Sequence, residues 1–279
     1  MASTCTRKYF EATLASGPVS CFVTSRDIFA NFCLPETKIL NNSFPALLER
    51  FVQRQLVWGS EEPTFPNAHS TSCNVVYGPM VLLPNEIDLV RAGDNHIDQA
   101  QLIRLTRAVA KTKIDAMWWQ DLGASTEMRK KENDNSWQWA KRLGELRNNR
   151  WHESLAVETH DGNIQGAILY WLNTRSFAEN DKGAVYIEAL ASAPRNRPWL
   201  VPSPLYRGVG EGLLLRATLH SYVVGLEGRV NLLSFRDQRT ASFYKNRGFE
   251  IVGEEEGLDQ MELSPAKAFQ WLKDEGYDL

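Results

Sequence analysis

The sequence contains no long apolar run. A membrane-spanning helix needs roughly eighteen or more consecutive apolar residues, and no segment reaches that length. The stretch from Met1 to Ser20 is polar and charged throughout, without the apolar core of a secretory signal. We therefore expect no membrane association and a cytoplasmic location.

Clustered positive charge is also missing. The 31 Lys and Arg residues are outnumbered by 34 Asp and Glu residues, which gives a formal net charge of −3 and a pI of about 6.0. No block of basic residues indicates a groove for a polyanion. Nucleic acid is therefore not an expected partner.

Cysteine is scarce. The four cysteines are Cys5, Cys21, Cys33 and Cys73, and no two of them form a C-x-x-C pair. Neither a zinc ribbon nor a redox motif is indicated. Buried free thiols are the favoured interpretation, a metal site that combines them with His69 is the minor alternative, and we expect no metal.

The apolar residues that are present predict a packed core, since 43% of the 279 residues are hydrophobic. Residues 86–279 can be divided into the elements of one α/β unit. Residues 1–85 do not fit that pattern, although Val19–Thr24 is strand-like and Phe44–Gln55 is a helix candidate. We interpret residues 1–85 as an accessory segment or small domain of unknown role.

The first part of the α/β unit is predicted to be mainly helical. A short strand covers Ile87–Arg91, and Asp94-Asn95 is expected to cap a helix that continues past Lys111. That helix would present Ile97, Ala100, Leu102, Ile103, Leu105, Ala108 and Val109. A second amphipathic helix would carry Trp137, Trp139, Ala140, Leu143 and Leu146 and end at Asn148-Asn149.

The rest of the unit is predicted to alternate strands and helices. The expected elements are a hairpin of His152–Glu158 and Ile164–Leu172 around Asp161-Gly162, a buried strand at Val185–Ser192, a helix at Gly208–Val224, a strand from Val230, a helix from Thr240, a hairpin of Phe249–Val252 with Met261–Leu263, and a last helix opened by Ser264-Pro265. The predicted order is strand, two helices, three strands, helix, strand, helix and two strands, followed by that last helix.

A glycine-rich loop, Arg207–Gly212, precedes the apolar run that opens the Gly208–Val224 helix. Backbone N–H groups at a helix N-terminus, together with the helix dipole, bind phosphate oxygens. The spacing R-x-x-G-x-G is neither a dinucleotide fingerprint nor a P-loop. We expect a phosphorylated ligand held by the amides of Val209 to Leu213, with Gly210 and Gly212 keeping Cβ atoms away from it. Arg207 either neutralises the phosphates or is a solvated residue.

These segments together resemble the GNAT superfamily of acyl-CoA-dependent N-acyltransferases. The loop resembles its pyrophosphate loop, Val185–Ser192 its central strand, Gln165-Gly166-Ala167 the strand before it, and Gln238–Phe249 the signature in which a Phe-Tyr pair precedes Gly-Phe. The resemblance implies an α/β (α+β) fold with a mixed, mostly antiparallel twisted sheet flanked by helices. Two departures are Gln238, where the family usually has Asn, and the long insertion Arg195–Tyr206.

The resemblance also implies the ligand and its binding residues. The ligand is acetyl-CoA, used as the acyl donor without a metal. The residues implied to bind it are Leu190, Ala191, Ser192, Arg207, Gly208, Val209, Gly210, Glu211, Gly212, Leu213 and Gln238.

Two residues are candidates for proton transfer. Glu188 is a lone acid within an apolar strand, on the face that we expect it to share with Leu190, and it would serve as general base directly or through water. Its structural alternative is an Arg partner or a water network. Tyr244 matches the family's general acid, and its alternative is packing beneath the cofactor. No nucleophile elbow is present, which disfavours a covalent acyl-enzyme.

The function implied is acetyl transfer from acetyl-CoA to a primary amine by direct attack. A small-molecule acceptor is favoured over a protein, and a homodimer is compatible with the sequence. The Trp-rich region of Trp118, Trp119, Trp137 and Trp199 would border the acceptor or simply pack. The alternatives are an acetyltransferase acting on a protein lysine or N-terminus, and a non-catalytic CoA-binding or interaction module.

Overall fold

The computed structural model describes residues 83–120, 126–146 and 151–279. The four cysteines, His69, the strand predicted at Val19–Thr24, the helix predicted at Phe44–Gln55 and the Asn148-Asn149 helix end lie outside the described residues. Within the described part of the chain, no helix is long and apolar enough to cross a membrane, and no three His, Cys, Asp or Glu side chains are grouped to hold a metal ion.

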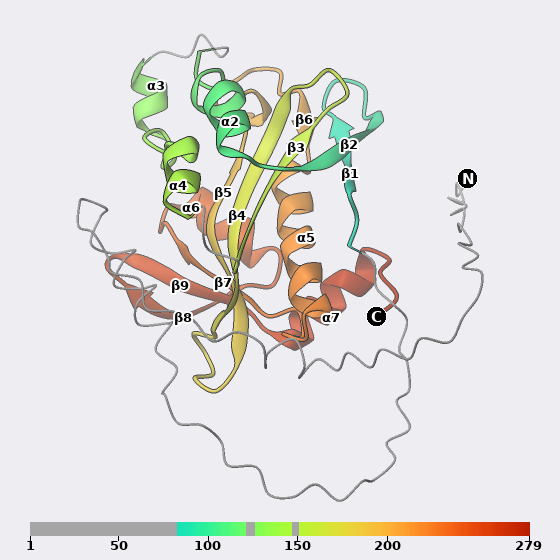
Figure 1. Cartoon of the computed structure of the whole chain (residues 1–279), viewed down its shortest axis with the longest axis vertical. Coiled ribbons are helices and arrows are strands. Elements are labelled where there is room, and N and C mark those ends of the chain that lie inside the picture. Colours follow the sequence, from blue (N-terminus) through green and yellow to red (C-terminus); the bar gives the residue numbers. More distant parts are fainter. Residues whose placement is uncertain (1–82, 121–125, 147–150) are drawn as a thin grey trace, which may run out of the picture. The chain divides into compact units, whose positions relative to one another are not determined.

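The described residues form a nine-stranded sheet with the order β6-β1-β2-β3-β4-β5-β7-β9-β8 (Figure 1). The strands are β1 (Glu86–Arg91), β2 (Ile97–Arg104), β3 (His152–Glu158), β4 (Ile164–Arg175), β5 (Gly183–Ser192), β6 (Tyr206–Arg207), β7 (Val230–Ser234), β8 (Glu250–Glu255) and β9 (Leu258–Leu263). Neighbouring strands are antiparallel except β5 and β7. The predicted fold class, a mixed and mostly antiparallel sheet flanked by helices, is confirmed.

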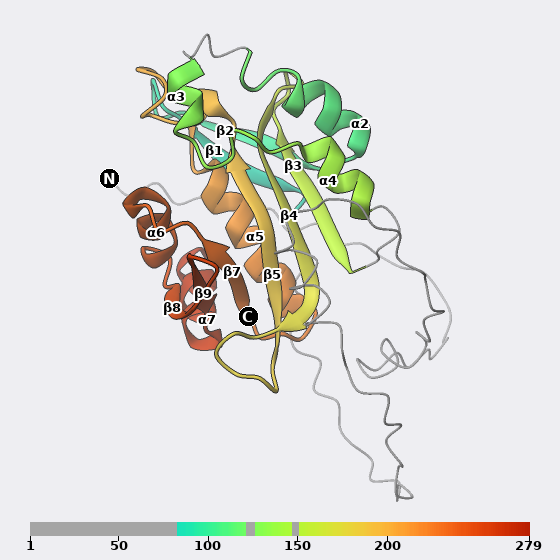
Figure 2. The ribbon, with the colours of Figure 1, turned by 90° about the vertical axis from the view of Figure 1, so that its left-hand side faces the viewer.

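Helices cover both faces of this sheet (Figure 2). The helices are α2 (Arg107–Val109), the π-helix η1 (Ala110–Asp115), α3 (Thr126–Lys130), α4 (Trp139–Leu146), the 3-10 helix η2 (Pro194–Asn196), α5 (Val209–Val223), α6 (Gln238–Lys245) and α7 (Pro265–Asp274).

Alternating residues of β4 show which helices lie on which face. Ile168 and Tyr170 pack with Leu213 of α5 in one apolar core, here called the α5 core. Ala167 and Leu169 point the other way and pack with η1 and α4 in a second core, here called the α4 core. The sheet therefore separates α5 from η1 and α4.

The helix predicted from residue 97 is wrong, because Ile97–Arg104 is strand β2, paired with β1 and β3. Asp94 and Asn95 form a turn and not a helix cap, with Asn95 at φ 57° and the Arg91 N–H donating to the His96 carbonyl. Side chains in β2 alternate between exposed and inward-facing positions, which is the period of a strand. The helix begins only after Thr106, whose hydroxyl accepts the Val109 N–H.

The other predicted elements are confirmed with boundaries that differ by at most three residues, apart from the second amphipathic helix, which starts at Trp139 and leaves Trp137 outside it. The β3–β4 hairpin turns at Asp161-Gly162, with Gly162 at φ 79°, and α5 lies between Gly208 and Gly225. The predicted order lacks β2, α3, η2 and β6. The insertion after β5 contains η2 and returns as β6 to pair with β1.

Gly166 on β4 gives a stability test of the contact between the sheet and α5. A Cβ on Gly166 would lie 2.4 Å from Val209 Cγ1 and 3.2 Å from the Ala191 carbonyl oxygen. We expect Gly166→Ala to lower the free energy of unfolding by roughly 1–3 kcal/mol through overpacking, measured by urea denaturation. Gly93→Ala is the control, because a Cβ there has open space. Equal stabilities of the two variants would contradict this close packing.

Candidate active site

The candidate site begins where β5 and β7 separate. The two strands pair only at Val185–Val230, Tyr186–Asn231 and Ile187–Leu232, whereas β5 continues to Ser192. On its other edge β5 stays paired with β4 up to Ser192, across an irregularity at which Leu169 pairs with Ala189 and Tyr170 with Ile187. Glu188 is therefore the extra residue of a β-bulge, which bends the strand at the point where β7 leaves it.

The bulge corrects the prediction that Glu188 and Leu190 share a face. Glu188 contacts Arg142 of α4 and Trp171 of β4, and the next residue, Ala189, packs in the α4 core. Leu190 packs against the α5 core on the opposite face. The extra residue of a bulge shifts the side-chain alternation, so positions two apart no longer point the same way.

Glu188 is paired through both of its carboxylate oxygens. Oε1 accepts from Arg142 Nη1 at 3.1 Å, and Oε2 accepts from Trp171 Nε1 at 2.8 Å. The Glu188 side chain is only 1% exposed, against 23% for Arg142. The Arg partner considered for Glu188 is thus present, and it stands on the more exposed side of the carboxylate.

Tyr244 lies in α6 and is 8% exposed. Its ring packs edge-on against Phe243 at 5.0 Å and Phe249 at 5.5 Å between centroids. Burial raises the pKa of Tyr244, so the phenol stays protonated at neutral pH. Within the described part of the chain its hydroxyl makes no hydrogen bond, which leaves the proton available for donation.

The N-terminus of α5 adjoins the end of β5. Gly208 has φ 85°, which favours glycine, and its carbonyl accepts the N–H of Gly212 in the first turn of the helix. The N–H groups of Val209, Gly210 and Glu211 therefore lack an intrahelical acceptor. A Cβ on Gly210 would lie 3.4 Å from both Ser192 Oγ and the Phe243 ring, so these amides border the space between β5 and α6.

Gly212 packs against β1. A Cβ there would come 2.9 Å from Ile87 Cδ1, so this glycine allows α5 to approach the strand. Its N–H is used inside the helix, and Leu213 is fully buried in the α5 core. The free amides are thus fewer than the predicted run from Val209 to Leu213.

The remaining predicted ligand residues are distributed around this helix end. Arg207 is exposed and donates to Asn95 in the β1–β2 turn, and Glu211 forms an ion pair with Arg247 at 3.0 Å. Gln238 is exposed at the first position of α6. The Ser192 carbonyl already accepts from Arg197 at 3.0 and 2.7 Å, while Leu190 and Ala191 lie on the part of β5 beyond β7.

Sequence reasoning missed the residues that hold the insertion in place. Arg197 is buried and pairs with Glu132 and Asp134, which precede α4. Trp199 donates to Glu132 at 2.9 Å, and the Arg239 guanidinium lies 4.1 Å from the centroid of the Trp199 ring. No local pattern links residues so far apart in the chain, so only the folded structure brings them together.

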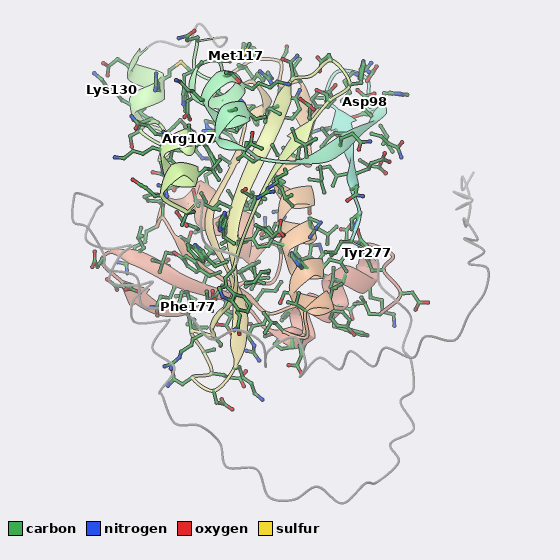
Figure 3. The ribbon with its side chains drawn as sticks, viewed as in Figure 1. Asp98, Arg107, Met117, Lys130, Phe177 and Tyr277 are labelled. Atoms are coloured by element: carbon green, nitrogen blue, oxygen red, sulfur yellow. The ribbon has the colours of Figure 1, made fainter. Side chains whose placement is uncertain are left out.

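A cavity of about 760 Å³ lies between α2–η1 and α4. Three of the four highlighted tryptophans, Trp118, Trp119 and Trp137, are among its lining residues, together with Arg107. Figure 3 labels Arg107 at α2, Met117 after η1 and Lys130 at the end of α3. Trp199 lies instead on the insertion, 46% exposed.

No family model and no curated protein sequence matches the chain. Similar solved structures include a mutant spermidine/spermine N-acetyltransferase SpeG from Vibrio cholerae, with 13% identity, 62% of this chain and 98% of that chain covered, and a TM-score of 0.39. A nucleotide-linked sugar GNAT, FdhC, has 10% identity and a TM-score of 0.42, and the match covers 68% of this chain and 96% of that chain. A GNAT-family acetyltransferase from Listeria monocytogenes has 14% identity and a TM-score of 0.39, and the match covers 62% of this chain and 98% of that chain.

These structural neighbours include GNAT proteins, the superfamily that the sequence motifs of this chain resemble.

Proposed function

We propose that this protein is an N-acetyltransferase that transfers an acetyl group from acetyl-CoA to a primary amine by direct attack. The observation that carries the proposal is the separation of β5 from β7 at Ile187, beyond which β5 leads to the free amides at the start of α5. A small-molecule amine is the proposed acceptor, and a protein lysine or N-terminus is the alternative.

The residues around this opening fit a phosphorylated thioester. The amides of Val209, Gly210 and Glu211 would receive the pyrophosphate, because a helix N-terminus with free N–H groups favours anions. The edge of β5 at Leu190 and Ala191 would pair with the amide groups of the pantetheine arm. The Glu211 carboxylate opposes an anion there, and its pairing with Arg247 offsets that charge. Acetyl-CoA would supply the activated acyl group.

Proton transfer is assigned to Glu188 and Tyr244. The Glu188 carboxylate takes the proton from the acceptor ammonium and leaves a neutral amine to attack the thioester carbonyl. The Tyr244 hydroxyl donates its proton to the departing sulfur and is reprotonated from solvent, while the amine nitrogen loses its second proton to solvent as the tetrahedral intermediate collapses. The sum converts an ammonium and a thioester into an amide, a thiol and one released proton.

A second candidate is a CoA-binding module without catalysis. The pairing of both Glu188 oxygens favours it, because Arg142 and Trp171 already occupy the oxygens that would have to accept the proton of the amine. In that case acetyl-CoA still binds, but no amine is acetylated.

The test is to measure binding and turnover on the same protein. We expect acetyl-CoA and CoA to raise the midpoint of thermal unfolding, and we expect a panel of primary amines to release free CoA thiol. Binding without thiol release from any amine would support the module. Absence of binding would reject both candidates.

Tyr244→Phe isolates the proposed acid. We expect kcat to fall roughly 10²–10⁴-fold, while the affinity for acetyl-CoA, measured by calorimetry, is largely kept. Tyr222→Phe is the control, since Tyr222 lies in the last turn of α5, at the opposite end of the helix from the free amides. Full activity of Tyr244→Phe would reassign the residue to packing.

A further inference from the structure

Arg142 covers the proposed base. Its guanidinium donates to Glu188 at 3.1 Å and lies over the Trp137 ring, 5.0 Å from the centroid. Because the Arg142 side chain is 23% exposed and that of Glu188 only 1%, Arg142 is the more solvent-accessible member of the pair, and its place beside the carboxylate is the one that an acceptor would have to take. Trp171 holds the other oxygen from within the sheet.

The charges around Glu188 favour a cation in this place. From α4, Glu145 also faces it, and burial raises the pKa of the Glu145 carboxyl, with Glu188 adding to the rise. From β5, the Tyr186 phenol is neutral, because burial raises its pKa. From β3, the His152 ring lies 5.9 Å from that of Trp171. Arg142 is thus the cation in direct contact with Glu188 among the described residues.

Removing a cation from a buried carboxylate without replacing it is strongly unfavourable. An exchange of one cation for another keeps the carboxylate paired, and an aromatic face such as that of Trp137 accepts either a guanidinium or an ammonium group. A neutral or anionic acceptor offers no such exchange.

We propose that Arg142 is a displaceable internal cation and that the ammonium group of the acceptor takes its place between Glu188 and Trp137. This inference rests on the proposed function, and it specifies the substrate class: the acceptor binds as an alkylammonium ion. After the exchange its proton is in contact with the carboxylate that removes it.

The experiment removes the Arg142 guanidinium by mutation and supplies a small cation from solution in its place. Arg142→Ala is titrated with methylguanidinium and methylammonium at constant ionic strength, and thermal unfolding is followed without any acyl donor. We expect saturable stabilisation, with a half-saturating concentration roughly tenfold lower than in the wild type, because a charge-assisted hydrogen bond becomes available. Acetamide, which is neutral, should give none.

Lys141→Ala is the matched control, because it removes an exposed cation from the same helix. An equal response of Lys141→Ala and Arg142→Ala to the two cations would overturn the proposal. So would a response that persists in Arg142→Ala/Glu188→Gln, where the carboxylate is gone.

If Arg142→Ala alone does not fold, we expect Arg142→Ala/Glu188→Gln to fold, because the double variant buries no unpaired charge. We then also expect methylguanidinium to raise the yield of folded Arg142→Ala on refolding. Failure of either result would overturn the proposal. Thermal stabilisation by the cations is measured independently of turnover. Stabilisation without acetylation of any amine would reject the proposed function and keep the cation site. Acetylation without stabilisation would reject the cation site and keep the proposed function.

Discussion

Arg197→Met is expected to lower the free energy of unfolding by about 3–5 kcal/mol, because it leaves the buried Asp134 carboxylate without its cation and Glu132 with only the more exposed Arg239. The Arg197 side chain is 7% exposed, and its guanidinium bonds to Glu132 at 2.8 Å and to Asp134 at 2.8 and 2.5 Å. Methionine fills a similar volume, so the loss reports on charge and hydrogen bonds and not on a cavity. Urea denaturation with a two-state fit measures it.

Arg236→Met is the matched control. Arg236 also pairs with two carboxylates, Glu254 and Asp259, but its side chain is 46% exposed. Exposed ion pairs contribute about 0–1 kcal/mol, so this variant should remain close to the wild type. Similar losses of unfolding free energy in the two variants would mean that the pairing of Arg197 with Glu132 and Asp134 does not hold the insertion in place.

Gly210→Trp is expected to weaken acetyl-CoA binding by at least about a hundredfold, because it would take away two or more of the charge-assisted hydrogen bonds that the proposed site would make to phosphate. The indole would fill the space beside Ser192 and Phe243 that the free amides of α5 border. Gly210 is half-buried at the first turn of the helix, so we expect the protein to stay folded. Calorimetry measures the affinity, and circular dichroism checks the fold.

Gly93→Trp is the control for adding an indole elsewhere. It lies in the β1–β2 connection, and a Cβ there has open space. Its acetyl-CoA affinity should equal that of the wild type. Unchanged affinity in Gly210→Trp would reject the start of α5 as the phosphate site.

Several elements were predictable because their signals are local. Gly208 and Gly225 at the ends of α5, the Asp161-Gly162 turn and the Ser264-Pro265 start of α7 each depend on backbone conformations that a few neighbouring residues determine. The start of α5 at the glycine-rich loop belongs to the same class, whereas the binding of phosphate by this helix N-terminus stays a prediction.

The sequence predictions failed where an apolar pattern was short or where pairing with a neighbouring strand decided the conformation. The apolar residues of Ile97–Arg104 fit a helix as well as a strand, and pairing with β1 and β3 on its two sides selects the strand. The face of Glu188 depends on a bulge, which exists because β4 and β5 pair with unequal numbers of residues. No sequence period reports that mismatch.

The sequence by itself determined the order of the main elements from β3 to α7, the glycines at the ends of α5 and the presence of a lone acid in β5, because these follow from local propensity and side-chain period. The tertiary structure decided that Glu188 faces Arg142, that Arg197 joins the insertion to the segment before α4, and that Gly212 serves packing. Those contacts join residues that are distant in the chain, and only the packing of helices onto both faces of the sheet brings them together.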